Sequence, residues 1–246
     1  LAILVETMRR EGYELMLGTP EVVTREVEGV LSEPVERLVL DVPEAFIGIV
    51  IERLGSRRGK LVNLGNPGHG RARIEYIVPS RGLVGFRSEF LTETRGQGLV
   101  HSVFEGWQIW GGPMNRRASG AIVADRLGDA TPYALFHLQP PGVLFIRPGD
   151  VVYEGMVVGE HNRPNDLEVN AIKEKKLSNV RNHGKDENLL LAPPRQMGLE
   201  QAIEWIDRDE LIEVTPRAVR IRKVILDGNR RPKRTATGDQ AEASAG

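Results

Sequence analysis

The residues best suited to chemistry in this sequence are basic, and they gather in residues 173–185. This segment holds five Lys or Arg side chains and one acidic side chain, with Asn and Gly between them. Lys and Arg neutralise phosphate groups, while Asn and Gly keep a loop polar and able to bend. The pattern favours an RNA-binding loop, and an ordinary solvated loop is the alternative. The candidate RNA contacts are Lys173, Lys175, Lys176, Asn179, Arg181 and Lys185.

Two smaller basic groups point the same way. Arg57, Arg58 and Lys60 follow one predicted helix, and Arg81 and Arg87 flank the start of the next. Residues 199–213 are opposite in sign, with six acidic side chains against one arginine. Paired carboxylates can serve acid–base or metal chemistry, but a solvated acidic helix face is the favoured interpretation. Such separation of charge in a chain of net charge −1 predicts one RNA-facing side.

Other chemistries find no support in the sequence. There is no cysteine, no G-x-S-x-G motif and no pair of histidines three or four residues apart. The phosphate-loop pattern is absent, since in its nearest approach, Gly55–Leu61, the glycines are too close and a leucine replaces the metal-binding hydroxyl. We therefore expect no catalytic residue, cofactor or metal in this chain. Apolar runs are too short for a membrane span, and the lack of cysteine fits a reducing cytoplasm.

The elements that position these groups are predicted to be of the α+β class. Residues 34–112 alternate as a strand, a helix, two strands, a helix and a strand, which is the βαββαβ order of a ferredoxin-like domain. The predicted strands are 35–42, 60–64, 71–78 and 98–107, and the predicted helices are 44–54 and 83–94.

The flanking regions have different patterns. Residues 1–33 are predicted to form a helix and two strands around a Gly-Thr-Pro turn, as the truncated end of another α+β domain. Residues 113–226 are predicted to be mainly β, with strands including 118–124, 134–138, 143–146 and 151–158 and a helix at 199–207. Residues 227–246 contain few apolar side chains, which predicts a disordered tail.

The string Pro79–Phe90 closely resembles the TypA/BipA family, which comprises ribosome-associated translational GTPases related to elongation factor G. Further strings match in the same order, so the resemblance covers nearly all of residues 1–226. These strings are residues 6–15, 152–159, 165–170, 175–181 and 210–216. The resemblance implies part of domain III at 1–33, a ferredoxin-like domain V at 34–112 and a family-specific C-terminal domain at 113–226.

The resemblance also implies a function. Such proteins bind the ribosome between its subunits and take part in large-subunit assembly and stress adaptation. The expected partners of this chain are the 50S or 70S ribosome, rRNA and the A-site tRNA, with residues 173–185 directed at the RNA. We expect a cytoplasmic monomer. GTP and Mg would belong to a G domain that this sequence does not contain.

A protein-interaction module is the alternative to RNA binding. Residues 106–115 are not typical of the family, and they contain Trp107 and Trp110. These rings are predicted to pack at the junction of two domains. In the alternative, they and the acidic 199–213 face would dock ribosomal proteins or another factor.

Overall fold

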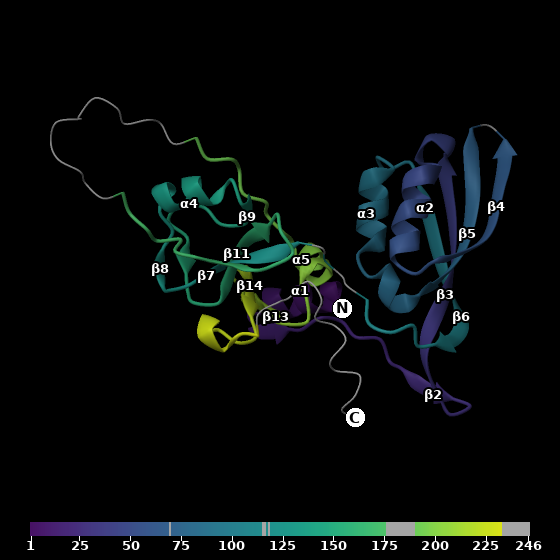
Figure 1. The fold of residues 1–246 in the computed structure, drawn as a ribbon, viewed down its shortest axis with the longest axis horizontal. Helices are drawn as coiled ribbons and strands as arrows, with labels where there is room; N and C mark the ends of the chain where they lie inside the picture. Colours follow the sequence, from purple (N-terminus) through teal and green to yellow (C-terminus); the bar gives the residue numbers. More distant parts are fainter. Residues whose placement is uncertain (69, 115–116, 118, 176–189, 233–246) are drawn as a thin grey trace. The chain divides into compact units, whose positions relative to one another are not determined.

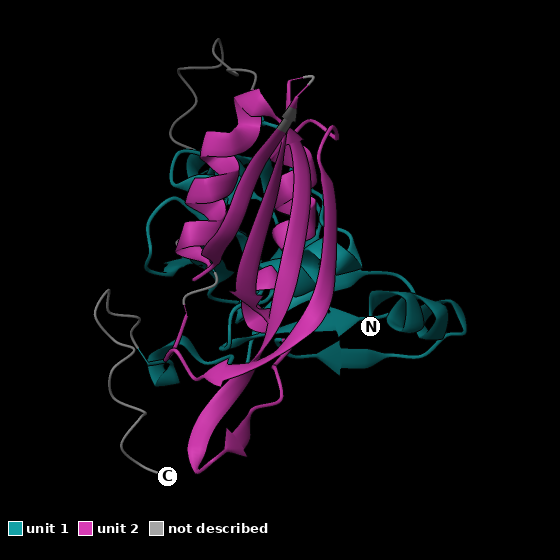
Figure 2. Cartoon of the chain, turned by 90° about the vertical axis from the view of Figure 1, so that its right-hand side faces the viewer, with its two compact units in different colours: residues 1–19, 115–246 teal, residues 20–114 magenta. Residues whose placement is uncertain are grey.

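The computed structural model describes residues 1–68, 70–114, 117, 119–175 and 190–232. The chain forms two compact units, coloured separately in Figure 2. Unit 2 is Pro20–Met114, and unit 1 combines Leu1–Thr19 with Asn115–Gly246. Unit 2 is therefore continuous in sequence, and along the chain it separates the two segments of unit 1.

Unit 2 contains an antiparallel sheet with two helices on one face (Figures 1 and 2). Its strands lie in the order β2-β3-β5-β4, and β6 also pairs with β3. The strands are β2 Arg25–Val27, β3 Val30–Pro43, β4 Lys60–Gly68, β5 Arg71–Pro79 and β6 Leu99–Ile109, and the helices are α2 Ile47–Ser56 and α3 Phe86–Glu93. Short 3-10 helices, Glu44–Phe46 and Ser80–Leu83, precede α2 and α3. The predicted α+β class is thus confirmed, with β3, α2, β4, β5, α3 and β6 following one another along the chain.

The core of unit 2 lies between this sheet and its helices. Alternate residues of β3 and β5, such as Leu40 and Ile74, are buried against Leu54 and Phe90 of the helices. Gly98 lies directly against the ring of Phe90, because a Cβ at this glycine would come within 2.4 Å of the ring. The apolar residues with helical spacing and those that alternate along the strands therefore pack in one core.

Unit 1 is built around a seven-stranded mixed sheet with the order β1-β13-β14-β11-β7-β12, in which β9 also pairs with β11. All its pairings are antiparallel except that of β12 with β7. These strands are β1 Leu15–Leu17, β7 Gly120–Ala124, β9 Gly142–Leu144, β11 Met156–His161, β12 Leu167–Val169, β13 Glu210–Val214 and β14 Val219–Lys223. A separate pair is formed by β8 Gly128–Asp129 and β10 Val151–Val152.

The described part of unit 1 contains the α-helices α1 Ala2–Arg10, α4 Pro132–Leu138 and α5 Leu199–Trp205. Val5 of α1 and four residues of α5 share a core with β13 and β14. Leu135 of α4 joins a second core with residues of β9, β10, β11 and β12. No helix in the described ranges is long and apolar enough to cross a membrane.

Two local predictions were wrong, and one is the single strand at 151–158, where the structure has two strands, β10 and β11. Residues 134–138 form most of α4 instead of a strand, because the Thr131 hydroxyl caps the helix by accepting a hydrogen bond from Ala134 N at 3.1 Å. Pro132 then occupies the first turn, where its missing N–H has no cost. Residues 228–230 form a 3-10 helix within the predicted tail, and residues 233–246 lie outside the described ranges. The domain boundaries remain a prediction.

Candidate nucleic-acid interface

The structure describes only the first three residues of the basic segment, 173–175. Lys173 and Lys175 are exposed, and neither has an ion-pair partner within the described residues. Leu190 begins the described chain on the other side. The remaining candidates of this segment lie outside the described residues, and they are Lys176, Asn179, Arg181 and Lys185.

The two residues that flank α4 hold the chain before and after this segment. At the start of the helix, the Thr131 hydroxyl donates to the carbonyl of Lys173 at 2.6 Å. At its end, Gln139 Nε2 donates to the carbonyl of Leu190 at 3.3 Å, and Gln139 Oε1 accepts from Ala192 N. One helix therefore fixes the chain on both sides of the basic segment.

The position of α4 is itself fixed by packing. Ala134 and Leu135 are almost fully buried, and Leu138 packs against the same core. Leu191, two residues before a Pro-Pro pair, packs there as well. The anchors of the basic segment thus rest on a close-packed part of unit 1, which resists displacement.

Three of the five basic candidates in unit 2 are engaged by the protein itself. Arg57 donates to the carbonyls of Gly82 and Val84 and forms an ion pair with Glu89 at 2.6 Å. Arg58 donates to the carbonyls of Gly112 and Pro113 at 3.3 and 2.7 Å. These arginines connect segments of unit 2, which the local sequence does not indicate.

Arg81 is the most buried of these candidates. Its guanidinium forms two hydrogen bonds with the fully buried Glu33, at 2.6 and 3.1 Å, and lies 3.9 Å from the ring centroid of Trp110. By contrast, Lys60 and Arg87 are exposed, and no ion pair is formed by either within the described residues. The side chains of Lys60 and Arg87 are therefore open to solvent in the described part of unit 2.

The two tryptophans of residues 106–115 both have partners inside unit 2. The Arg25 guanidinium lies 4.0 Å from the ring centroid of Trp107, and Trp107 also contacts Phe104 edge-on. Trp110 donates its backbone N–H to Leu31 and stacks on Arg81. Cation–π contacts of this kind stabilise the folded unit and cover part of each ring.

The acidic segment is not a uniformly solvated face, so that prediction was wrong for Glu210. Its carboxylate is completely buried and accepts hydrogen bonds from Arg117 at 2.8 and 3.0 Å and from Lys223 at 2.9 Å. Lys223 is also fully buried and contacts Asp166 at 2.6 Å and Asp209 at 2.7 Å. Sequence reasoning missed this network because its partners come from segments far apart in the chain.

Burial and charge act in opposite directions on the pKa values of this network. Burial disfavours the charged form of Lys223, but the carboxylates of Glu210, Asp209 and Asp166 outweigh it and raise the Lys223 pKa. Burial would likewise raise the Asp166 pKa, but the Lys223 ammonium and the Ala121 N–H outweigh it and lower that pKa. Both shifts favour the charged forms, so Lys223 and Asp166 are charged at neutral pH.

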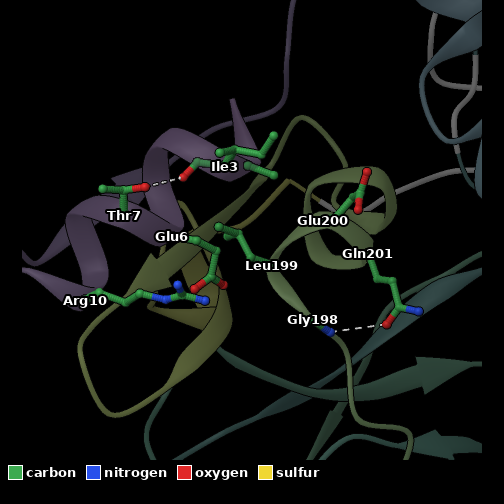
Figure 3. Close-up of a pocket in the computed structure, with 9 residues that line it drawn as sticks. Ile3, Glu6, Thr7, Arg10, Gly198, Leu199, Glu200 and Gln201 are labelled. Carbon is green, nitrogen blue, oxygen red and sulfur yellow. Dashed lines mark hydrogen bonds between the residues drawn. The ribbon is translucent and has the colours of Figure 1, made fainter.

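An open depression of about 620 Å³ lies between α1 and α5 (Figure 3). Glu6 and Arg10 line it on one side, and Glu200 and Gln201 on the other. Figure 3 shows two hydrogen bonds among its lining residues: Thr7 donates to the Ile3 carbonyl, and Gln201 accepts from Gly198 N. Its lining holds no nucleophile beside a general base, and no three His, Asp or Glu side chains of the described chain gather as a metal site.

Two matches to known families define the class of this protein, which is elongation factor G-like. Residues 30–118 match the family described as elongation factor G C-terminus. Residues 119–228 match the TypA/BipA C-terminal domain, and the chain belongs to the TypA/BipA family as its C-terminal region.

Relatives of known name support this assignment. The chain is 48% identical over 98% of its length to the large ribosomal subunit assembly factor BipA of Salmonella typhimurium. It is 47% identical to the same factor of Bacillus subtilis over 95% of its length, and 49% identical to that of Synechocystis over 91%. The chain spans 40%, 38% and 38% of the length of these relatives, respectively.

Proposed function

We propose that this chain is the ribosome-binding part of a large-subunit assembly factor and that residues 173–185 contact RNA. The observation that carries the proposal is the anchoring of this basic segment on both sides by Thr131 and Gln139, with Lys173 and Lys175 exposed. The name of the relatives, large ribosomal subunit assembly factor, indicates the partner: the 50S subunit, alone or in the 70S ribosome.

Electrostatics support RNA as the contacted component. A chain of net charge −1 has no overall attraction to nucleic acid, so binding must depend on local groups. Lys173 and Lys175 supply charge without an ion-pair partner in the described chain, and Lys60 and Arg87 supply a second site on unit 2. We infer that the basic segment binds rRNA or the acceptor end of the A-site tRNA. We also infer that the protein acts as a monomer in the cytoplasm.

Two finer assignments belong to this proposal. The strand order and the antiparallel pairing of unit 2 support a ferredoxin-like domain V. The missing phosphate-loop pattern supports a chain that binds RNA and that neither binds nor hydrolyses GTP itself.

The protein-docking alternative has less support from the geometry. It depended on free tryptophans and a free acidic face. Trp107 and Trp110 are stacked on arginines, and Glu210 is buried between Arg117 and Lys223.

Co-sedimentation with 50S subunits and 70S ribosomes at two salt concentrations tests the proposal. The wild-type chain is compared with Lys175→Glu/Lys176→Glu. The control, Arg10→Glu/Arg208→Glu, reverses two exposed charges of unit 1 away from the basic segment. GTP turnover by the purified chain is measured in parallel and should be absent.

The expected result is binding that weakens with salt. If about four phosphates are contacted, log K falls with a slope of about −3 against log salt, and losing two contacts reduces that slope by about 1.4. The control keeps the wild-type slope. Binding that ignores both salt and the Lys175→Glu/Lys176→Glu change would overturn the proposal in favour of a protein–protein contact.

A further inference from the structure

One face of α4 carries three aromatic rings. Tyr133, Phe136 and His137 are spaced i, i+3 and i+4, which places them side by side on a helix. The ring centroids of Tyr133 and His137 are 4.5 Å apart, and those of Phe136 and His137 are 5.6 Å apart. They form a continuous aromatic surface, called here the α4 aromatic face.

This face points away from the core. The opposite side of α4 holds Ala134, Leu135 and Leu138, which pack inside unit 1. Phe136 is 39% exposed, His137 is exposed and Tyr133 is partly exposed. Because the buried side fixes the orientation of the helix, the three rings cannot turn inward without dismantling that packing.

The rings are also ordered before any ligand binds. His137 Nδ1 lies 2.8 Å from the carbonyl oxygen of Tyr133, which can only accept, so Nδ1 carries the proton and donates. This bond and the contact with Tyr133 hold the imidazole in one orientation. A preorganised flat surface loses little entropy when a planar ligand stacks on it.

The start of α4, the helix that carries the aromatic face, is joined to the start of the basic segment. Thr131, which caps α4, also holds the carbonyl of Lys173, and exposed Lys173 and Lys175 follow from that point. Exposed aromatic rings beside ammonium groups are the two components of a single-strand site, in which bases stack on rings and cations neutralise phosphates. Aromatic residues make up only 5% of the chain, so this grouping is not typical of its surface.

We propose that the α4 aromatic face stacks against an unpaired nucleobase of the RNA strand whose phosphates Lys173 and Lys175 contact. This inference rests on the proposed function and adds a second kind of recognition to it. An unpaired base is required because bases within a duplex are already stacked on their neighbours. Every base has a π-face, so the contact tolerates different sequences.

Fluorescence anisotropy with two labelled 12-nucleotide RNAs tests this inference on the full chain. One RNA is an unstructured strand, and the other has the same phosphates but abasic residues at its central positions. The variants Phe136→Ala and Phe136→Leu remove the ring, and Phe136→Tyr keeps it. The matched control is Phe104→Ala in unit 2, where the phenylalanine is 57% exposed. Circular dichroism melts confirm that each variant is folded.

The expected loss for Phe136→Ala and Phe136→Leu is about 5- to 150-fold on the base-containing RNA, the range for one stacked base. The abasic RNA should bind these variants and the wild type equally, and Phe136→Tyr and Phe104→Ala should bind as the wild type does. The salt slope should stay unchanged, because no phosphate contact is lost.

The two proposals fail in different ways. Salt-dependent binding that is weakened by Lys175→Glu but not by Phe136→Ala or Phe136→Leu would overturn the stacking site and leave the phosphate contacts standing. Equal loss on both RNAs would also overturn stacking, since the abasic strand has no base to lose. The absence of any salt-dependent RNA binding by the wild type would overturn both proposals.

Discussion

Replacing Lys223 by methionine should destabilise unit 1 severely. The Lys223 ammonium is fully buried and contacts the carboxylates of Asp166, Asp209 and Glu210 at 2.6, 2.7 and 2.9 Å. Methionine fills a similar volume but leaves these carboxylates without their shared cation. Removing one member of a buried ion pair costs about 3–5 kcal/mol, and the lower end applies here because Glu210 keeps Arg117 and Asp209 is half exposed. For a unit of this size, the full range corresponds to a fall in melting temperature of about 6–20 °C, so a fall toward its lower end is expected.

Differential scanning calorimetry measures this effect. Lys223→Met should lower the melting transition of unit 1 and leave that of unit 2 unchanged, because none of its partners belongs to unit 2. The matched control is Glu105→Gln, which removes one carboxylate from the solvent-exposed pair with Arg37. Solvent screens that pair, so its loss should not displace either transition measurably.

A near-neutral result would refute the reasoning. If the free energy of unfolding of Lys223→Met lies within about 1 kcal/mol of the wild-type value, the three carboxylates gain water or protons at little cost. The network would then contribute little to stability, despite its burial. A shift in the unit 2 transition of the same size would instead show that the two units unfold together.

Three further predictions concern single features. The folded-state pKa of Asp166 lies below its ordinary 3.8, so the stability that its charged form contributes is present above that pH and is lost as the pH falls. The melting temperature of unit 1 should therefore drop in acid, and this drop should be smaller in Lys223→Met than in the wild type. Gly98→Ala forces a Cβ to within 2.4 Å of Phe90, so denaturant unfolding should show unit 2 destabilised by about 1–3 kcal/mol. Thr131→Ala removes the α4 cap and should cost about 1 kcal/mol; unaltered amide exchange at Ala134 would contradict that role.

Elements with a strong local pattern were predictable from the sequence. The strands and helices of unit 2 were predicted within a few residues, because alternation in β5 and helical spacing in α2 reflect a core on one side only. The α4 helix was missed, because its run of apolar residues is too short to distinguish a helix from a strand by periodicity. The Thr131-Pro132 pair was the signal that would have identified it.

Partnerships between distant residues were not predictable. Nothing near Glu210 in the sequence indicates that Arg117 and Lys223 surround it, and nothing near Arg81 indicates Glu33. A charged residue looks the same in a sequence whether it is solvated or buried with a partner. The fold decides between these environments through pairings that span many residues, and single-sequence patterns report only neighbours.

The insertion of unit 2 between β1 and the rest of unit 1 sets an order of events during synthesis. Leu15 pairs with Val214, so β1 cannot complete its ladder until nearly the whole described chain has been made. Unit 2 is continuous and can fold as soon as its own residues emerge. Pairing across such a separation is slow, because a long loop must close before any contact forms. Until β13 has been made, the backbone groups of β1 that pair with it are unpaired. During this interval the chain is most exposed to wrong pairing with another copy.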